Sequence, residues 1–471
     1  MSQTKILLVI AVILVSLWFQ LRRDFIRGLA YAVFLCVLLP TELRIQIPGN
    51  LPQLTIYRLI LISLFVSWLC NRELRRGIAP PPLLPYLWLW GVANLISLLL
   101  TQADFVDCLK RFLDRTLEVF AFYYLISRSL RTSDDARRIV RAILNALVIV
   151  SVLGIYERHA GFNLSVAYLG GGSSGGPYGG IQSTFQHRIL LGGALAMGVP
   201  LAFVLMCWDE EAPRRSRSLF LWSAIALLIA ACYFTNSRGP WLALALALGI
   251  VGLLGSKRMK KMVVSIGLAA LMALALKPGV WESLSQRAAE TTEANSLKGG
   301  NFFYRLELWK VAWNEISQSP ERLLFGCGPG SGAGREISWD LSYRGTRDEI
   351  SSWDNQWAYD LFQSGCIGFA VTLALYWALI KARFHSWRFG EPLERDRHVC
   401  ILASECAMVF MMTNVLIFSK QLDYMFWSLV ASGYVLATRS VEEPCEQTAE
   451  AVKFAGNSDN ALSELPPAES F

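Results

Sequence analysis

Residues 188–208 read RILLGGALAMGVPLAFVLMCW and contain no charged side chain after Arg188. An α-helix needs about 20 mainly apolar residues to cross the hydrocarbon core of a bilayer, and this stretch has that length. Backbone N–H and C=O groups find no water there, so a spanning segment must pair them internally. The stretch therefore predicts a transmembrane helix.

Similar apolar runs recur along the whole chain of 471 residues. They lie near residues 5–20, 25–41, 56–70, 82–100, 105–127, 138–156, 188–208, 218–235, 240–255, 262–277, 357–381, 399–418 and 423–438. Hydrophobic residues make up 54% of the chain and charged residues 17%, against roughly 25% charged in typical globular domains. We expect an all-α polytopic membrane protein of about 12–13 transmembrane helices, the first of them retained rather than cleaved.

The connectors between these runs are alternately basic and nearly uncharged. Basic connectors stay on the cytoplasmic side of a membrane, so this alternation predicts an N-terminus outside and a C-terminus in the cytoplasm. The expected organisation is a transmembrane bundle of about ten helices over 1–277, a large, partly helical periplasmic loop over 278–356, about three further helices over 357–438 and a disordered acidic cytoplasmic tail over 439–471.

The net charge of +7 does not indicate a nucleic-acid partner, because the positive residues form short clusters between the apolar runs. His159 and His187 fall on the outer side, and His385 and His398 on the cytoplasmic side. No pair of them has the spacing of zinc ligands. We therefore expect neither a metal nor a cofactor.

The run 105–127 differs from the others because its first half is charged, with Asp107, Asp114, Arg115 and Glu118 among its residues. Charged side chains are costly in the hydrocarbon region and usually face a bundle interior or a water-filled cavity. This half of the run lies either at the membrane interface or against a polar cavity inside the bundle.

Asn236-Ser237-Arg238-Gly239-Pro240-Trp241 forms a very short connector on the outer side. Proline in the first turn, after glycine, predicts a tight entry into the next helix. Arg238 has two interpretations. It is a helix-end cation that extends toward the interface, or it binds an anion such as a diphosphate, for which the forked donors of arginine are well suited.

The outer loop over 278–356 is rich in aromatic and glycine residues. A helical spacing within it, with Arg305 one turn before Trp309, predicts a helix that caps the bundle or lies on the membrane surface; the apolar positions are Phe302, Leu306, Trp309, Trp313 and Ile316. The tryptophans favour an interfacial belt, a platform for sugar rings, or both. The sequence FGCGPGSGAG over 325–334 leaves the backbone open to a glycan or diphosphate, and it lacks the Gly-Lys-Ser/Thr of a nucleotide-binding loop.

This loop contains no histidine, which excludes a Ser–His or Cys–His pair within it. Its carboxylates remain as proton acceptors. Asp354 differs from the others because Trp353-Asp354-Asn355-Gln356-Trp357 leads directly into the next apolar run. Partial desolvation there would raise the pKa of the carboxyl group and make it a better base.

Several of these pieces, taken in order over residues 110–380, resemble the O-antigen ligase / O-antigen polymerase family of bacterial membrane glycosyltransferases. The matching pieces are Glu118, Tyr156-Glu157 with Gly161-Phe162-Asn163-Leu164, Thr184-Phe185-Gln186-His187, Ser237-Arg238-Gly239, Arg305 with Trp309, Ala312 and Pro320, Phe325-Gly326 with Gly328 and Gly330, and Asn355 with Trp357, Gly365 and Gly368.

The resemblance implies a GT-C-like bundle that moves a glycan from undecaprenyl diphosphate to an acceptor hydroxyl without metal or nucleotide. It implies that Arg238 and Arg305 bind the diphosphate. The family's base is usually a histidine just before the asparagine that closes the loop, and Asp354 occupies that position here. Either Asp354 serves as the base, or His187 does so from another helix, or the usual activity is lost. Candidate glycan contacts are Trp309, Trp353, Asn355, Trp357, Gly328 and Gly330.

We interpret the chain as a metal-independent glycosyltransferase of the bacterial inner membrane, acting in cell-surface polysaccharide or lipopolysaccharide assembly as a ligase or a polymerase. Its expected partners are an undecaprenyl-diphosphate-linked glycan, an acceptor glycan or lipid A–core, and membrane lipids. The alternative is a multispan transporter of polysaccharide or lipid-linked sugar without chemistry. A transporter predicts ionisable residues near the middle of several spans, whereas here the charge gathers at one surface, except in the run 105–127.

Overall fold

The computed structural model describes residues 3–45, 53–75, 81–169, 179–185, 187–208, 215–276, 297–332, 337–341, 346–350, 352–416 and 419–439, with a few single residues between 279 and 289. The acidic tail expected beyond residue 439 lies outside this part of the chain. Helices dominate what is described, and every apolar run found in the sequence falls on a helix. The prediction of an all-α polytopic membrane protein is confirmed.

The helices up to residue 276 account for the first ten apolar runs. Their bounds are α1 (Gln3–Arg23), α2 (Phe25–Leu38), α3 (Ile56–Cys70), α4 (Arg72–Arg75), α5 (Leu84–Leu99), α6 (Phe105–Phe112), α7 (Glu118–Ser129), α8 (Ser133–Ala160), α9 (Leu164–Leu169), α10 (Arg188–Trp208), α11 (Arg215–Phe234), α12 (Arg238–Leu254) and α13 (Lys257–Leu276). The remaining helices are α15 (Leu297–Ile316), α16 (Pro320–Phe325), α17 (Gln356–Phe389), α18 (Pro392–Met411) and α19 (Lys420–Arg439).

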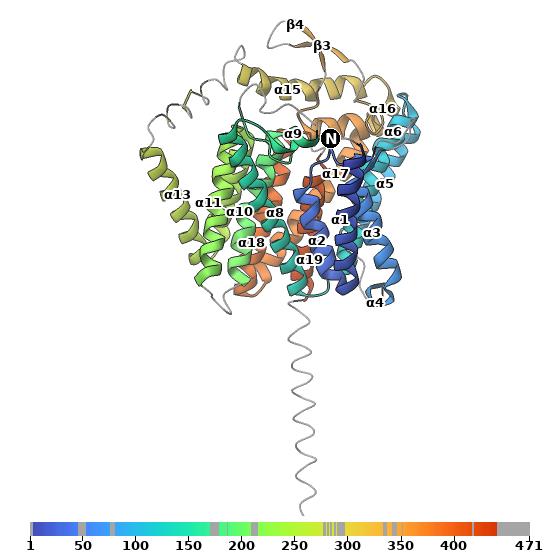
Figure 1. The fold of residues 1–471 in the computed structure, drawn as a ribbon. Coiled ribbons are helices and arrows are strands. Elements are labelled where there is room, and N and C mark those ends of the chain that lie inside the picture. Colours follow the sequence, from blue (N-terminus) through green and yellow to red (C-terminus); the bar gives the residue numbers. More distant parts are fainter. Residues whose placement is uncertain are drawn as a thin grey trace, which may run out of the picture.

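The long helices lie side by side, and α15 lies across one end of the bundle (Figure 1). We call this the upper end. The N-terminal end of α1 and the short α9 lie there too, and an antiparallel hairpin of β3 (Ile337–Leu341) and β4 (Thr346–Ile350) stands above α15. A second antiparallel pair joins β1 (Arg44–Ile45) to β2 (Leu54–Thr55). Helices α15 and α16 and the β3–β4 hairpin therefore cap the bundle.

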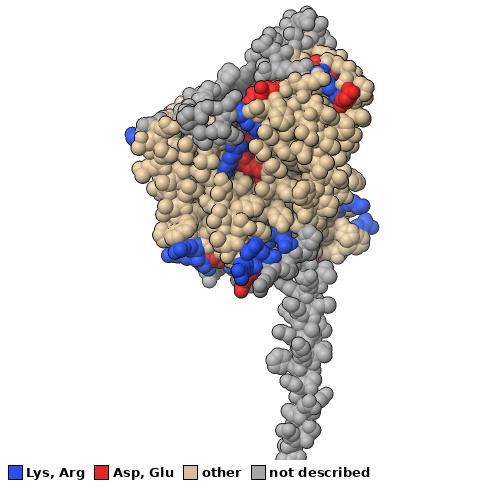
Figure 2. All heavy atoms as spheres, turned by 90° about the vertical axis from the view of Figure 1, so that its right-hand side faces the viewer, with Lys and Arg blue, Asp and Glu red and all other residues tan. Residues whose placement is uncertain are grey.

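Five of the described helices, α1, α8, α10, α11 and α17, are long and apolar enough to cross a membrane. Four shorter ones, α2, α3, α5 and α12, are apolar as well. Viewed from the side of α3 and α5, most of the surface is neither acidic nor basic, and Lys and Arg gather along the lower edge (Figure 2). This distribution agrees with the predicted cytoplasmic side, which stays a prediction.

Helix α10 is enclosed on all sides. Every residue from Ile189 to Trp208 is buried, and the helix packs against α8, α11, α12 and α18. Glycines permit this close packing, because a Cβ at Gly192 would lie 2.5 Å from Pro240 and one at Gly198 would lie 2.6 Å from Leu147. The uncharged stretch that forms α10 is thus the centre of the core.

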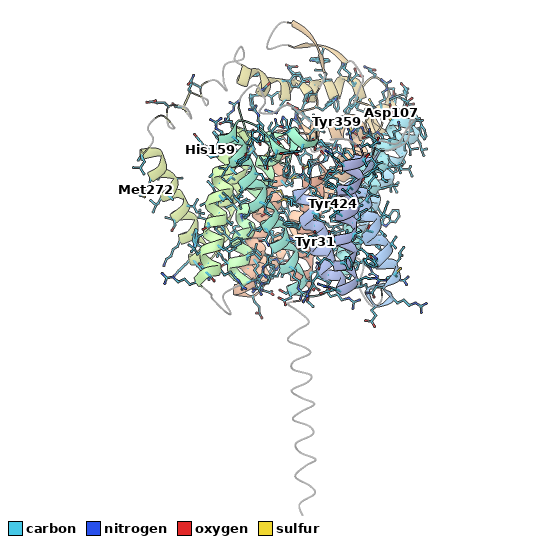
Figure 3. All side chains as sticks on the ribbon, in the orientation of Figure 1. Tyr31, Asp107, His159, Met272, Tyr359 and Tyr424 are labelled. Carbon is cyan, nitrogen blue, oxygen red and sulfur yellow. The ribbon has the colours of Figure 1, made fainter. Side chains whose placement is uncertain are left out.

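The charged run 105–127 divides into α6, a π-helical turn over Leu113–Leu117 and α7. Asp107, on α6, lies at the upper end (Figure 3) and is exposed, whereas Glu118 is only 6% exposed. Each of the two alternatives therefore holds for one part of the run. Its start lies at the surface, and the π-helical turn leads into a polar interior, which is a common setting for such turns.

Candidate functional site

Arg305 and Asp354 meet at the upper end of the bundle. Arg305 lies on α15, and its Nε donates a hydrogen bond to the backbone carbonyl of Asp354 at 3.1 Å. Its Nη2 lies 3.9 Å from the Oδ2 of the same residue. The Oγ of Ser352 donates to the Oδ1 of Asp354 at 2.6 Å. The side chain of Asp354 is 39% exposed, so the carboxylate is held in place and still open on one side.

The residues on both sides of Asp354 anchor it. Trp353 is buried, and its ring lies 4.6 Å from that of Phe362 between centroids. Asn355 caps α17, because its Oδ1 accepts from two backbone N–H groups in the first turn at 3.1 and 3.2 Å. Its Nδ2 donates to the backbone carbonyl of Arg305 at 3.5 Å. The start of α17 and the middle of α15 are thus joined at the predicted site.

His187 and Arg238 belong to the same cluster of charges. Burial lowers the pKa of His187, and the positive charges of Arg188 and Arg305 lower it further, while the carboxylate of Asp354 raises it. Burial also lowers the pKa of Arg305, where Asp354 opposes the shift and Arg238 adds to it. The structure therefore brings together the four residues that we predicted as catalytic or diphosphate-binding. With its pKa below the usual value near 6.5, His187 is uncharged at neutral pH.

The hydrogen bonding of His187 indicates its tautomer. It stands just before α10, and its Nδ1 accepts from the backbone N–H of Ile189 at 3.4 Å. In a neutral imidazole one nitrogen accepts and the other carries the proton. The proton then sits on Nε2, so His187 offers the cluster a donor. Asp354 is left as the proton acceptor among the four residues.

Arg238 is positioned by the turn that precedes α12. Asn236 has a φ of 52°, a left-handed conformation that asparagine tolerates, and its Nδ2 donates to the carbonyl of Gly179 at 3.4 Å. Gly239 lets α12 begin close to the end of α18, because a Cβ there would lie 3.2 Å from Asn414. The charge of Arg238 lowers the pKa of Arg305, and its role as an anion ligand stays a prediction.

The glycine-rich loop after α16 packs tightly against other parts of the protein. A Cβ at Gly328 would lie 2.2 Å from the Oγ1 of Thr101, and one at Gly330 would lie 2.3 Å from the Cγ of Arg111. The N–H of Gly328 donates to the carbonyl of Gln363 at 3.0 Å, and the N–H of Gly330 donates to its Oε1 at 2.7 Å. Both N–H groups are paired within the protein, so here the glycines permit close packing; their contact with a glycan stays a prediction.

The predicted tryptophans differ in exposure. Trp353 and Trp357 are buried, and Trp309 is partly buried. The exposed aromatic rings on α15 are instead those of Phe302 and Trp313, at 46% and 55%. Buried rings shape the site through packing, whereas stacking on a sugar needs an open face. Contact with a glycan remains a prediction for all three predicted residues.

The helix expected around Arg305 is confirmed as α15, and the face that it packs against the protein is largely separate from the apolar stripe noted in the sequence. The fully buried apolar side chains are Leu308, Val311, Ala312 and Ile316. Of the predicted stripe only Ile316 is fully buried, and Phe302 and Trp313 are exposed. Apolar residues thus occupy two faces of α15, one packed against the protein and one exposed, and the place of the helix across the end of the bundle agrees with the predicted cap.

Sequence reasoning missed a polar network in the interior below the site. Arg58 pairs with Asp114 at 2.7 Å and with Glu118 at 3.4 Å, and Lys420 lies 3.3 Å from both carboxylates. Tyr424, labelled in Figure 3, donates through its hydroxyl to the Oε1 of Glu118 at 3.0 Å. The available signal was an arginine within an apolar run, since such a residue usually has an interior partner.

Polar contacts connect the start of α17 to this interior. The Nη2 of Arg115 donates to the Oε1 of Gln356 at 3.0 Å, and the Nε2 of Gln356 donates to Asp360 at 2.6 Å. These three residues line a cavity of about 70 Å³, which is room for roughly two water molecules. Within the described residues, no group of three or more His, Cys, Asp or Glu is placed to hold a metal ion.

The fold and the cluster define a multi-spanning membrane protein with two guanidinium groups, an imidazole and a carboxylate gathered at one end of its bundle. Residues 223–373, from α11 into α17, match the family model for O-antigen ligases. This range contains Arg238, Arg305 and Asp354, and it confirms the family resemblance found in the sequence. A comparison with curated proteins gave no match.

Proposed function

We propose that the protein transfers a glycan from undecaprenyl diphosphate to an acceptor hydroxyl at the outer face of a bacterial inner membrane. The O-antigen ligase domain supports a glycosyltransferase of the ligase or polymerase type. The observation that carries the donor chemistry is the contact of Arg305 with Asp354, at 3.1 Å to its backbone carbonyl and 3.9 Å to its carboxylate, within reach of the charge of Arg238. A guanidinium group whose pKa is lowered by a neighbouring arginine is stabilised when an anion binds between the two.

The reaction breaks the bond between the anomeric carbon of the donor sugar and an oxygen of the diphosphate. The acceptor oxygen forms the new bond to that carbon, and its proton passes to the carboxylate of Asp354. Arg238 and Arg305 stabilise the negative charge that grows on the departing diphosphate. The Nε2–H of His187 donates a further hydrogen bond to that anion.

Asp354 is a weak base in isolation, because an aspartate has a pKa of about 3.9. The acceptor hydroxyl becomes strongly acidic as its oxygen bonds to the anomeric carbon, so the proton moves late in the reaction. A diphosphate between the arginines also competes for Arg305, whose Nη2 is only loosely paired with Asp354 at 3.9 Å. Donor binding thus frees the carboxylate to act.

The proposal places the upper end of the bundle in the periplasm and the end of α19 in the cytoplasm. Basic connectors at the opposite end support this orientation. The donor lipid lies in the membrane, and its sugar then reaches the cluster beneath α15. The acceptor approaches the same cluster from the periplasm, as a polysaccharide end or as lipid A–core.

The transporter alternative predicted ionisable residues inside several spans, and Arg383 and Glu405 are such residues. Both are fully buried, and the Nε of Arg383 lies 3.1 and 3.2 Å from the two carboxylate oxygens of Glu405. The Nη2 of Arg383 donates to the carbonyl of Val430 at 3.0 Å. The pair ties α17, α18 and α19 together.

The function is tested with purified protein in liposomes that contain a labelled undecaprenyl-diphosphate glycan and an acceptor. Transfer in the presence of a metal chelator, with release of undecaprenyl diphosphate, is expected. A ladder of products indicates a polymerase, and one glycan on lipid A–core indicates a ligase. Arg238→Ala should abolish transfer. Arg215→Ala changes an arginine at the start of α11, the end of that helix farther from Arg238, and should leave transfer unchanged. Equal activity of both variants would refute the diphosphate role.

A further inference from the structure

The cavity of about 70 Å³ below the candidate site is lined by oxygen-bearing side chains from four parts of the chain. Asn94 belongs to α5, Thr116 to the π-helical turn, Asp360 to α17 and Asp423 to α19. The reaction proposed above uses none of these side chains. Carboxylate, amide and hydroxyl oxygens are the ligands that hard cations prefer in proteins. A space for roughly two water molecules admits one small ion together with a water.

Three of these side chains have oxygen atoms without a partner. Among the residues that the structure describes, no hydrogen bond reaches the Oδ1 of Asn94 or the Oγ1 of Thr116, and no hydrogen bond or ion pair reaches the carboxylate of Asp423. The Nδ2 of Asn94 donates to the carbonyl of Trp90 at 2.8 Å, which leaves its Oδ1 available. Thr116 is only 2% exposed and Asn94 only 9%. Because buried polar atoms nearly always have a partner, these oxygens indicate a ligand in the cavity.

The charges around the cavity do not cancel. The neighbouring polar network is neutral, because it pairs two cations with two anions, namely Arg58 and Lys420 with Asp114 and Glu118. Among the described residues that line the cavity, this leaves Arg115 in the interior against two carboxylates, those of Asp360 and Asp423. Arg111 lines the cavity too, but its side chain is exposed, so water screens its charge. One buried negative charge is in excess, and it is costly unless a cation neutralises it.

We propose that this cavity binds a monovalent metal cation, Na⁺ or K⁺, among the oxygens of Asn94, Thr116, Asp360 and Asp423. The ion reaches them directly or through the one water for which the cavity also has room. A single positive charge cancels the excess, whereas a divalent ion would reverse it. Two carboxylates with neutral oxygens are enough for such an ion, which needs no cluster of three acidic or sulfur ligands.

The ion is structural and takes no part in the transfer step. It joins α5, the π-helical turn, α17 and α19 directly below the first turn of α17. Gln356 lines the same cavity and stands two residues after Asp354. Occupancy of the cavity therefore stabilises the part of the fold that holds the proposed base, and this inference holds whatever substrate the protein uses.

Thermal unfolding of the full-length protein in lipid nanodiscs tests the proposal. The salt is NaCl, KCl or N-methylglucamine chloride, and mixtures keep the ionic strength constant. Raising Na⁺ or K⁺ from about 1 to about 100 mM should raise the transition temperature by roughly 2–5 °C, because a ligand that binds only the folded state stabilises it. The ion with the larger effect is the one that the cavity prefers. Equal transition temperatures in all three salts would mean that water alone fills the cavity, and they would overturn the proposal.

Asp423→Asn assigns the response to the cavity, because it removes the excess charge and keeps the shape of the side chain. The variant should lose the response to Na⁺ and K⁺. In N-methylglucamine chloride it should unfold at a temperature no lower than that of the wild type, since its cavity is neutral without an ion. Asp107→Asn, which changes an exposed carboxylate on α6, is the matched control and should respond as the wild type does. An Asp423→Asn protein with the wild-type response would place the ion elsewhere and overturn the proposal.

Thr116→Val provides a second variant, which keeps the proposal testable if Asp423→Asn fails to fold. It leaves every charge in place and removes one neutral ligand. The concentration of Na⁺ or K⁺ that gives half of the stabilisation should rise by about three- to tenfold, the effect of losing one hydrogen-bond-like contact. An unchanged concentration would show that the hydroxyl does not contact the ion and would contradict the proposed ligand set.

Discussion

The Nε of Arg305 donates to the backbone carbonyl of Asp354 at 3.1 Å, while its Nη2 remains 3.9 Å from the carboxylate of the same residue. One arginine thus fixes the main chain beside the proposed base and keeps its outer nitrogen weakly paired. A diphosphate can take that nitrogen without releasing the main chain. The position of the base and the binding of the leaving group are therefore coupled through one side chain.

Arg305→Lys should lose most of the transfer activity although the charge is kept. Lysine cannot hold the Asp354 carbonyl and an anion at the same time, because it lacks the planar fork of arginine. The expected loss is about 10²–10³-fold in kcat, the usual effect of removing one donor to a developing oxyanion. Arg322→Lys, in the same cap on α16, serves as the control and should be fully active. A fully active Arg305→Lys enzyme would show that a point charge at this position is enough for catalysis and that the fork of arginine is not needed.

Asp354→Asn should abolish transfer, because the amide cannot accept the proton of the acceptor hydroxyl. Loss of a general base costs about 10²–10⁴-fold in rate. Asp354→His should restore much of it, and Ser352→Ala, which removes only a hydrogen bond to the carboxylate, should cost less than about tenfold. Rates are measured with saturating donor. If Asp354→Asn retains full activity, the base is another group.

The depressed pKa of His187 predicts a pH-dependent stability. Below about pH 6.5 the histidine of the unfolded chain gains a proton, whereas the buried one in the folded state gains it only at a lower pH. The unfolded state then binds more protons, so the free energy of unfolding falls as the pH drops through this window. His187→Asn keeps a helix-capping acceptor and should lower this slope by up to about 1.4 kcal/mol per pH unit, the contribution of one proton. The slope is measured by thermal unfolding between pH 7.5 and 5.5.

Glu118→Gln should destabilise the bundle much more than Tyr424→Phe. The first change leaves Arg58 and Lys420 with only Asp114 between them, and breaking a buried ion pair costs about 3–5 kcal/mol. The second removes a single hydrogen bond, worth about 1 kcal/mol. Thermal unfolding in lipid nanodiscs measures both, with the exposed Asp107→Asn as the neutral reference. Equal effects of Glu118→Gln and Tyr424→Phe would contradict the network.

The helices could be predicted from the sequence, and so could the end of the bundle that carries the candidate site, because both follow from local sequence. Apolar runs of sufficient length define spans, and Arg238 and Asp354 drew attention because charged residues next to such runs are unusual. Their mutual proximity could not be predicted. It depends on how α12, α15 and α17 pack, and no pattern within one segment records a contact between segments far apart in the chain.

The glycine-rich loop and the polar network show the same limit. Glycines signal that something approaches the backbone closely, and the sequence does not tell whether this is a ligand or Thr101 and Arg111. The charges of Asp114 and Glu118 pointed to a polar interior, but their partners come from α3 and α19. Such partners become evident only once the helices are placed side by side.

The complete enclosure of α10 has a consequence for biosynthesis. The ribosome makes this helix long before α18, one of the four helices that surround it. During that interval its uncovered flank rests against acyl chains, which an uncharged helix tolerates well. Closure of the core is therefore a late step that follows insertion. Changes at Gly192 or Gly198 should pass the translocon normally and fail afterwards, as inserted but unassembled chains open to membrane proteases.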